Sequence, residues 1–162
     1  VTIRPMRRRD LKSGVMDVES AAYPRPWSLG VFQSELDQMR SGTRHYLVAL
    51  RGGEIVGHAG IWFTGEEAHV TNLAVAPTAR RLGIATKLMC AQADEVIGKG
   101  CTAWTLEVRV SSTGAQELYR QFGFVPAGVR MRYYENTEDA IVMWCHDIDT
   151  PAYAARLREL AA

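Results

Sequence analysis

The 162-residue sequence has no apolar run long enough to cross a lipid bilayer, no internal repeat and no low-complexity linker. It also has little excess charge, because 19 Lys and Arg residues face 18 Asp and Glu residues and leave a formal net charge of +1. This balance does not favour nonspecific binding to nucleic acid or to an anionic membrane. The basic cluster at residues 7–9 is interpreted as a solvated face, with nucleic-acid binding as the weaker alternative. We therefore expect no direct nucleic-acid or membrane partner.

Cysteine is scarce and shows no spacing typical of disulfides or of a metal site. Cys90, Cys101 and Cys145 are odd in number and form no C-x-x-C pair, so we expect free thiols in a reducing cytoplasm. No signal peptide is visible, because the arginines near the start are followed by no hydrophobic segment. The histidines are scattered without ligand spacing, so we expect no bound metal. They are His45, His58, His69 and His146.

The length suits one domain with one core. Apolar periodicity and turn residues predict strands at 2–6, 46–50, 55–63, 68–75, 104–108, 125–132 and 140–145. They predict helices at 10–22, 28–39, 83–98 and 111–122, and a last helix from 151. A strand–helix–strand unit implies parallel pairing of the strands that end at Val75 and Val108. We expect an α/β fold, a mixed and mostly antiparallel sheet of about seven strands flanked by helices.

The segment from Asn72 to Thr86 predicts a site for phosphate oxygens. An apolar strand ends there, a Pro-containing loop follows, and Gly83 opens a helix whose first backbone N–H groups have no partner within the helix. No Gly-Lys-Ser/Thr follows, which excludes a Walker loop, and no G-x-G-x-x-G is present, which excludes a Rossmann fingerprint. The alternative is an ordinary connection with a solvated basic turn, since basic residues oppose the dipole at a helix start.

Two further residues carry chemistry beyond this loop. Glu107 lies in an apolar strand, where a charge is costly, so it either forms an ion pair with Arg109 or Arg132 or acts as a general base. Tyr119 near the end of a short helix is either a core aromatic with a solvated hydroxyl or a general acid toward a thiolate. The sequence pattern alone leaves both choices open.

Four segments occur in the order and spacing typical of one enzyme superfamily. They are Asn72-Leu-Ala-Val-Ala-Pro, Arg80-Arg-Leu-Gly-Ile-Ala, Leu106-Glu-Val-Arg-Val-Ser and Leu118-Tyr-Arg-Gln-Phe-Gly-Phe. The chain thereby resembles the GNAT superfamily of acetyl-CoA-dependent N-acetyltransferases. Pro26-Trp-Ser, Glu107-Val-Arg, Tyr133-Tyr134 and Glu138-Asp-Ala-Ile-Val-Met are more specific, and they resemble the RimI-type ribosomal-protein-alanine N-acetyltransferases. The likeness extends to about Ile148.

The resemblance implies a GNAT-like domain over residues 1–148, with a helical extension at 149–162 packed on it. It implies acetyl-CoA as co-substrate, with Glu107 as general base and Tyr119 as general acid. The implied cofactor-binding residues are Leu73, Ala74, Val75, Arg81, Leu82, Gly83, Ile84, Ala85, Thr86 and Ser112. Ser112 departs from the family pattern, because it stands where the family often has an Asn that contacts the cofactor.

The implied acceptor is the N-terminal alanine of a small-subunit ribosomal protein, and possible further acceptors are other protein N-termini. Trp27, Tyr133 and Tyr134 would form the acceptor groove, although Trp27 is equally consistent with simple core packing. Glu138 and Asp139 would attract the cationic N-terminus or merely cap a hairpin. We expect a monomer or weak dimer. The alternatives are a GNAT enzyme that acts on lysine or small-molecule amines, and a non-catalytic acyl-CoA-binding module.

Overall fold

The computed structural model describes residues 1–134 and 138–162, and within them seven strands form one sheet in the order β1-β2-β3-β4-β5-β7-β6. The strands are β1 (Thr2–Pro5), β2 (Arg44–Arg51), β3 (Glu54–Thr64), β4 (Glu67–Val75), β5 (Ala103–Arg109), β6 (Val125–Tyr134) and β7 (Glu138–His146). The neighbouring strands pair antiparallel except for the parallel pair β4–β5. The predicted mixed sheet with one parallel pair is confirmed.

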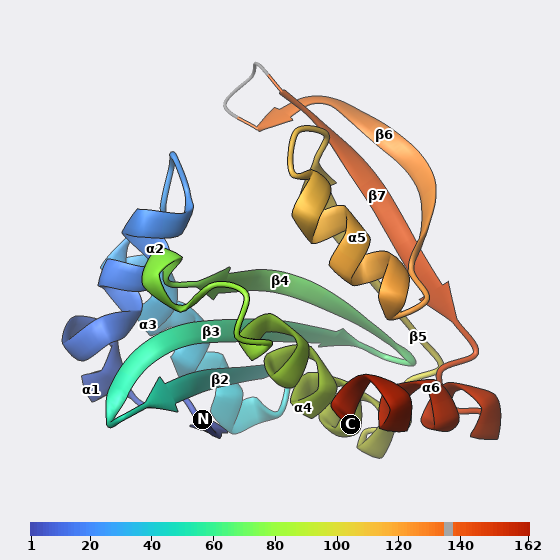
Figure 1. The fold of residues 1–162 in the computed structure, drawn as a ribbon, viewed down its shortest axis with the longest axis horizontal. Coiled ribbons are helices and arrows are strands. Elements are labelled where there is room, and N and C mark those ends of the chain that lie inside the picture. The colour runs from blue at the N-terminus through green and yellow to red at the C-terminus, as the bar shows by residue number, and fades with distance from the viewer. Residues whose placement is uncertain (135–137) are drawn as a thin grey trace.

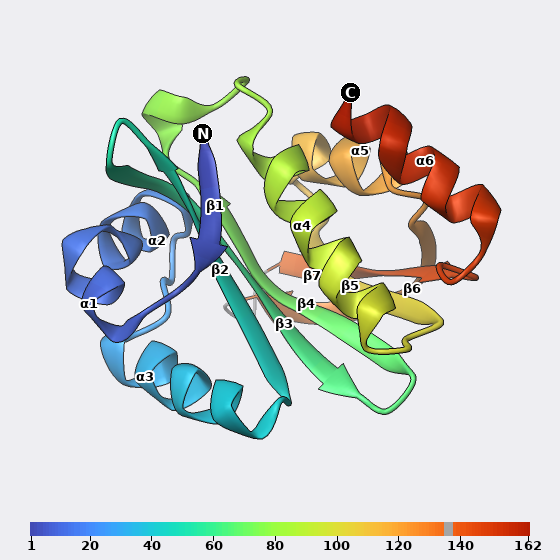
Figure 2. The same ribbon diagram turned by 90° about the horizontal axis from the view of Figure 1, so that it is seen from below.

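Helices cover both faces of this sheet (Figures 1 and 2). They are α1 (Arg8–Asp10), the π-helix η1 (Leu11–Val15), α2 (Met16–Ala22), α3 (Leu29–Asp37), the short 3₁₀ helices η2 (Gln38–Ser41) and η3 (Pro77–Ala79), α4 (Ile84–Gly98), α5 (Thr113–Gln121) and α6 (Pro151–Ala161). In Figure 2, α1 to α3 lie on one side of the sheet and α4 lies on the other. Each side has its own apolar cluster, one centred on Phe32 and Tyr46 and one on Ile84 and Leu88.

The helix predicted at 10–22 differs from the structure, because its first half winds as a π-helix over Leu11–Val15. Gly14 lies in this stretch, directly against strand β3. A Cβ atom at Gly14 would lie 2.7 Å from Cβ of Ile55. The close approach of helix and strand depends on this glycine, and helical periodicity alone does not reveal such a contact.

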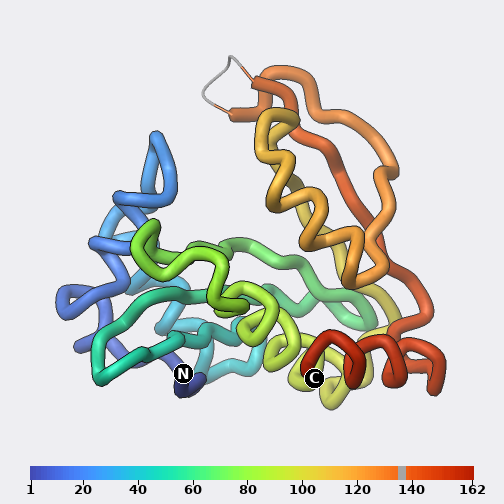
Figure 3. The backbone as a smooth tube through the Cα atoms, in the orientation of Figure 1, coloured from blue at the N-terminus to red at the C-terminus, as the bar shows by residue number. Residues whose placement is uncertain are grey.

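Strands β4 and β5 pair only at their beginnings, and this opens the sheet. Residues 67–69 pair with residues 103–105, after which β4 continues to Val75 and β5 continues to Arg109 without pairing each other. Figure 1 shows the resulting V, with β2 to β4 in one arm and α5, β6 and β7 in the other. The tube in Figure 3 follows both arms from their common vertex. The divergence leaves one edge of β4 open to ligands, since those backbone groups have no strand partner on that side.

The last helix, α6, packs on a third apolar cluster, in which its Tyr153 and Leu157 lie with Phe122 at the end of α5. The Tyr153 hydroxyl donates to the Phe122 carbonyl at 2.6 Å, and the Arg156 guanidinium donates to the Gln121 carbonyl at 3.1 Å. Both carbonyls lie at the end of α5, where the helix leaves carbonyl groups unsatisfied. Helix α6 therefore fixes the end of α5, which carries Tyr119. Among the described residues, no helix combines the length and the apolar character that a membrane crossing requires.

Candidate active site

A groove of about 890 Å³ lies in the V between β4 and β5. Its lining includes most residues that the sequence assigned to cofactor binding, together with both predicted catalytic side chains. They are Leu73, Ala74, Val75, Arg81, Gly83, Ile84, Ala85, Thr86, Ser112, Glu107 and Tyr119. Leu82 does not line the groove and is 46% exposed to solvent. The structure therefore brings the loop, the strand edge and the two catalytic candidates into one continuous hollow.

The start of α4 presents free backbone N–H groups to this groove. Gly83 precedes the helix with φ 74°, and no side chain caps it. Arg81 also has a positive φ, 65°, so the chain is tightly coiled before the helix begins. The first helical turn leaves its N–H groups unpaired, and the helix dipole makes this end attractive to anions. Arg80 and Arg81 also line the groove, so the predicted anion site has both amides and positive charge.

The opposite wall of the groove is the turn between β5 and α5. The Gln116 side-chain amide donates to the carbonyls of Arg109 and Val110, each at 3.0 Å, and this pins the turn. Ser112 immediately precedes α5, yet its hydroxyl makes no cap hydrogen bond to the helix. The Ser112 hydroxyl is therefore not committed to capping, and a hydroxyl can both donate and accept.

A second cavity of about 410 Å³ meets the groove at the catalytic candidates. Its lining includes the three aromatic residues predicted for the acceptor, Trp27, Tyr133 and Tyr134. Trp27 also packs on Phe32, with ring centroids 5.2 Å apart, so it both supports the core and faces the cavity. Six residues line both hollows. They are Tyr23, Leu73, Glu107, Arg109, Tyr119 and Tyr134.

Glu107 stands where the two hollows meet, and its side chain is 17% exposed. Its Oε2 lies 2.5 Å from His69 Nε2, and its Oε1 lies 3.4 Å from Arg130 Nη1. The hydrogen bond from His69, with the positive charge of Arg130, lowers the pKa of Glu107. Glu107 does form an ion pair, but with Arg130 rather than with Arg109 or Arg132, because the pairing β5–β7–β6 brings Arg130 to this carboxylate.

Tyr119 is 8% exposed and packs against Phe124, with ring centroids 5.9 Å apart. Burial raises the pKa of the Tyr119 hydroxyl, so it stays protonated throughout the neutral range. The backbone around it is fixed, because the amides of Phe122 and Phe124 both donate to the Tyr119 carbonyl at 3.0 Å. The site thus contains an ionised carboxylate and a neutral phenol, which are a proton acceptor and a proton donor.

Glu138 and Asp139 line neither hollow and make contacts within the protein. Glu138 Oε1 lies 3.2 Å from Arg109 Nη1, and its Oε2 accepts a hydrogen bond from the Ser111 amide at 2.9 Å. Asp139 Oδ1 accepts from the Arg132 amide at 2.8 Å. These carboxylates connect the start of β7 to the end of β5 and to β6, so the structure does not bring them to the acceptor cavity.

The sequence reasoning missed a buried polar cluster in the wall of the acceptor cavity. Glu19 accepts hydrogen bonds from the Asn72 side-chain amide at 3.0 Å and from the Trp27 amide at 2.9 Å. His58 Nε2 lies 3.5 Å from Glu19 Oε1, and burial raises the pKa of Glu19. A signal was present, because Glu19 follows the apolar Val15 by four residues and therefore lies on the buried stripe of the helix.

Acidification should destabilise the wild-type protein relative to a His58→Gln variant, by up to about 3 kcal/mol. Burial lowers the pKa of His58 from 6.5 to about 4, whereas the unfolded chain keeps the ordinary value. The unfolded state therefore binds the proton first, and stability is lost as the pH falls from about 6.5 to about 4. Urea unfolding of both proteins across this range measures the difference. A difference that does not change with pH would show that His58 is charged in the folded state.

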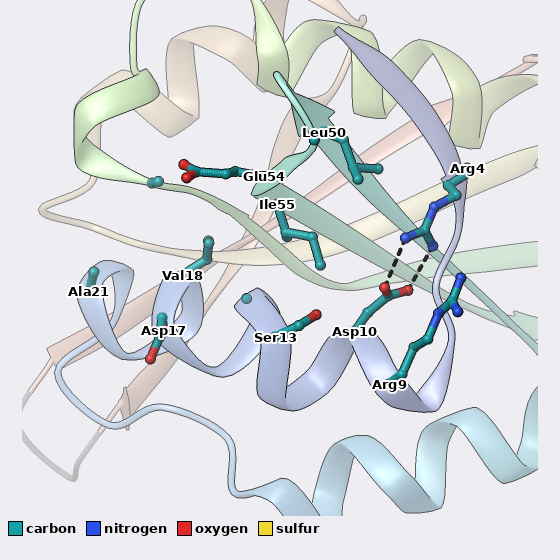
Figure 4. Close-up of a pocket in the computed structure, with 13 residues that line it drawn as sticks. Arg4, Arg9, Asp10, Ser13, Asp17, Val18, Ala21, Leu50, Glu54 and Ile55 are labelled. Carbon is teal, nitrogen blue, oxygen red and sulfur yellow. Dashed lines mark hydrogen bonds and ion pairs between the residues drawn. The ribbon is translucent and has the colours of Figure 1, made fainter.

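A separate hollow of about 600 Å³ lies between the start of the chain, α1 to α2 and the β2–β3 turn (Figure 4). Asp10 faces it but is already paired, because Arg4 donates to both carboxylate oxygens at 2.7 and 2.8 Å. Among the described residues, this hollow shares no lining residue with the two cavities above. In the same part of the chain, no group of three or more His, Cys, Asp or Glu side chains is placed to hold a metal ion.

Comparison with known proteins agrees with this geometry. The profile of the Acetyltransferase (GNAT) family matches residues 13–124. The ribosomal protein bS18-alanine N-acetyltransferase of Escherichia coli K12 is 33% identical over 146 residues, which cover 88% of this chain and 95% of that protein. A Bacillus subtilis protein that has provisionally been given the same name is 36% identical over 143 residues, which cover 88% of this chain and 93% of that protein.

Solved structures of acetyltransferases also match this chain. The crystal structure of the Escherichia coli ribosomal-protein-alanine N-acetyltransferase matches with a TM-score of 0.81 and 30% identity, and the match covers 90% of this chain and 93% of that chain. Ard1 from Thermoplasma volcanium shares the fold, with a TM-score of 0.82 at 23% identity. The family profile covers more than half of the sequence, and relatives above 30% identity cover most of it. The chain therefore belongs to the GNAT family of acetyltransferases.

Proposed function

We propose that this protein transfers an acetyl group from acetyl-CoA to the α-amino group of a protein N-terminus. The proposed acceptor is the N-terminal alanine of a small-subunit ribosomal protein, as in the relatives named for that activity. One observation carries the proposal: the groove and the acceptor cavity meet at Glu107 and Tyr119. A thioester in the groove and an amine in the cavity would therefore react between a carboxylate and a phenol.

The groove suits the pyrophosphate and the pantetheine arm of coenzyme A. The free amides of residues 83–86 and the guanidinium of Arg81 suit the pyrophosphate. The unpaired edge of β4 at residues 73–75 suits the amides of the pantetheine arm. The Tyr23 hydroxyl donates to the Leu73 carbonyl, so hydrogen bonds from the arm depend on the other backbone groups of this edge. The Ser112 hydroxyl on the opposite wall would replace the family Asn.

The chemistry of the amine favours an α-amino group over a lysine side chain. A peptide α-amine has a pKa of about 8, so a large fraction is neutral near pH 7.5. A lysine amine has a pKa of about 10.4, so only about one molecule in a thousand is neutral there, which costs roughly 4 kcal/mol. Glu107 has a lowered pKa and is therefore a weak base. An α-ammonium loses its proton more readily than a lysine ammonium does, so the α-amino group suits Glu107 better.

The proposed reaction takes two protons from the acceptor ammonium and gives one proton to the departing thiolate. The acceptor ammonium gives one proton to the Glu107 carboxylate, directly or through one water. The neutral nitrogen then attacks the thioester carbonyl, the new C–N bond forms, and the C–S bond breaks. Tyr119 gives its hydroxyl proton to the departing thiolate, and burial keeps that proton in place beforehand. The acceptor nitrogen loses its second proton as the C–S bond breaks, and water carries that proton to the Tyr119 oxygen. The proton held by Glu107 passes to solvent, so one proton is released for each ammonium that is acetylated.

The proposal is tested by measuring thiol release from acetyl-CoA with three peptides. One begins with a free alanine, one is the same peptide already acetylated, and one has a blocked N-terminus and a single lysine. Release with the first peptide alone is the expected result. Release with the lysine peptide alone would reject the N-terminal specificity, and no release with any peptide would favour a binding module.

Replacing Tyr119 by Phe should lower kcat about 100-fold and leave the affinity for coenzyme A within about twofold. The ring keeps its packing against Phe124, while the hydroxyl proton needed by the thiolate is lost. Steady-state kinetics and calorimetric titration with coenzyme A separate these effects. Equal loss of turnover and of affinity would indicate that Tyr119 supports packing only. Phe63→Leu, a change in a partly buried aromatic residue that does not line the groove, is the matched control.

A further inference from the structure

The proposed reaction uses Glu107 but gives no role to His69, whose imidazole contacts the Glu107 carboxylate. His69 is on β4 and pairs with Thr105 of β5 in the last parallel pair before the strands diverge. Glu107 is two residues further along β5, on the same face as Thr105. Divergence of the strands therefore begins directly beside the 2.5 Å contact between His69 Nε2 and Glu107 Oε2.

His69 lies behind Glu107 as seen from the groove and the acceptor cavity. Glu107 lines both cavities, whereas His69 lines neither, and the His69 side chain is 25% exposed to solvent. On its other side His69 packs on Trp62 of β3, with ring centroids 6.3 Å apart. Trp62 is 40% exposed. The imidazole therefore contacts both the proposed base and the solvent without occupying substrate space.

The charged groups around this pair come from three strands. Glu107 of β5 faces the imidazole directly, and Arg130 of β6 lies 3.4 Å from the other carboxylate oxygen of Glu107. Arg44 of β2 stacks on the ring of Trp62, with its guanidinium carbon 5.1 Å from the ring centroid. Arg44 is itself paired with Glu35, at 3.1 Å, so a charged imidazole would share the Glu107 carboxylate with Arg130.

We propose that His69 is a positioning residue of the acetyltransferase: it orients the Glu107 carboxylate toward the amine and makes proton acceptance depend on the ionisation of the imidazole. This inference rests on the proposed function, because it assumes that Glu107 receives the amine proton. His69 does not touch the substrates and acts through Glu107.

The proton positions in the His69–Glu107 contact explain this role. A nitrogen–oxygen contact of 2.5 Å needs a proton between the two atoms, so Nε2–H donates to Oε2. Oε1 accepts from Arg130 at 3.4 Å and keeps a second lone pair that can receive the amine proton. A second proton on the imidazole, at Nδ1, converts the contact into a carboxylate–imidazolium pair. Two cations then face Glu107, and its affinity for another proton falls. Acidification favours the imidazolium over the neutral imidazole, so this inhibition grows as the pH falls.

The test compares wild type with His69→Gln over about pH 6 to pH 8.5, using one alanine peptide as acceptor. Glutamine keeps an N–H donor for Glu107 but does not titrate. The amine ionises identically in both assays, so it cancels in the ratio of the two kcat/KM values. We expect the ratio of wild type to variant to fall by about threefold to tenfold from the alkaline to the acidic end. A ratio that is constant across this range would overturn the proposal.

Two more variants separate positioning from folding. His69→Ala removes the donor, and we expect about a tenfold loss of kcat with unchanged KM for acetyl-CoA. His146→Gln, at an exposed histidine stacked on Trp144, is the matched control and should behave as wild type. Wild-type kcat in His69→Ala would also overturn the proposal. If Glu107→Gln is fully active the proposed base is wrong, whereas an inactive Glu107→Gln with a constant His69→Gln ratio rejects only the role of His69.

Discussion

Replacing Glu107 by Gln should lower kcat for an alanine-starting peptide by about 10²- to 10⁴-fold, the usual contribution of a general base. The amide keeps the shape of the side chain, and its oxygen can still accept the hydrogen bond from His69. Only the capacity to take a proton is lost. The loss therefore measures proton acceptance rather than packing.

The pH dependence of this loss has a definite sign. The pKa of Glu107 is lowered in the folded protein, so the wild-type carboxylate is ionised throughout the neutral range. The acceptor ammonium, with a pKa of about 8, loses its proton without help as the pH rises. The deficit of the variant should thus be largest near pH 6 and should shrink toward pH 9. Glu66→Gln, at an exposed position in the β3–β4 turn, is the matched control. Equal rates for Glu107→Gln and wild type at all pH values would remove Glu107 from the mechanism.

Replacing Gly60 by Ala should destabilise the protein by about 4 kcal/mol, which is large for a single methyl group. A Cβ atom at Gly60 would lie 2.1 Å from Cε2 and 2.4 Å from Cζ of Tyr46. Tyr46 is fully buried, and its hydroxyl contacts Glu35 at 2.7 Å and Thr71 at 2.9 Å. The ring is held at both ends and cannot move away without breaking these contacts.

This effect should extend to the active site. Gly60 pairs with Asn72, and the register of β3 and β4 shifts between Gly60 and Ile61, directly beside the part of β4 that faces the cavities. Thermal unfolding should show a fall in Tm of about 10 °C, given a few degrees per kcal/mol for a domain of this size. Gly98→Ala is the control, because Gly98 lies in α4 with no atom within 4 Å of an added Cβ. A Tm within about 2 °C of wild type for Gly60→Ala would contradict the proposed contact.

Much of the fold follows from local patterns in the sequence. Turn residues such as Gly52-Gly53 and alternating apolar residues predicted the hairpins, and the strand–helix–strand order predicted the parallel pair. The loop at residues 80–86 was recognisable because a glycine before a helix has only a few physical uses. The roles of Glu107 and Tyr119 remain predictions, although the structure brings both residues to one place.

Other features depend on contacts between segments that are far apart in the sequence. The partners of Glu107 are 38 and 23 residues away, and neither His69 nor Arg130 is marked by any local pattern. The sequence left Glu138 and Asp139 either as residues that attract the acceptor or as caps of a hairpin. In the structure Glu138 contacts Arg109 and the Ser111 amide, and Asp139 accepts from the Arg132 amide. A side chain's role depends on which neighbour satisfies it, and strand order decides that neighbour.

The sequence by itself determined the class of the fold. It also predicted an anion-binding turn and, through its resemblance to the GNAT superfamily, two candidate proton-transfer groups. These predictions depend on residue type and spacing within segments of the chain and on the order of those segments, where periodicity and backbone preference act directly. Only the tertiary structure decided how far β4 and β5 stay paired, where the two cavities meet and which cations surround Glu107. Those features arise from packing between distant strands, because side chains that meet across a sheet are selected by strand order and register rather than by their positions along the chain.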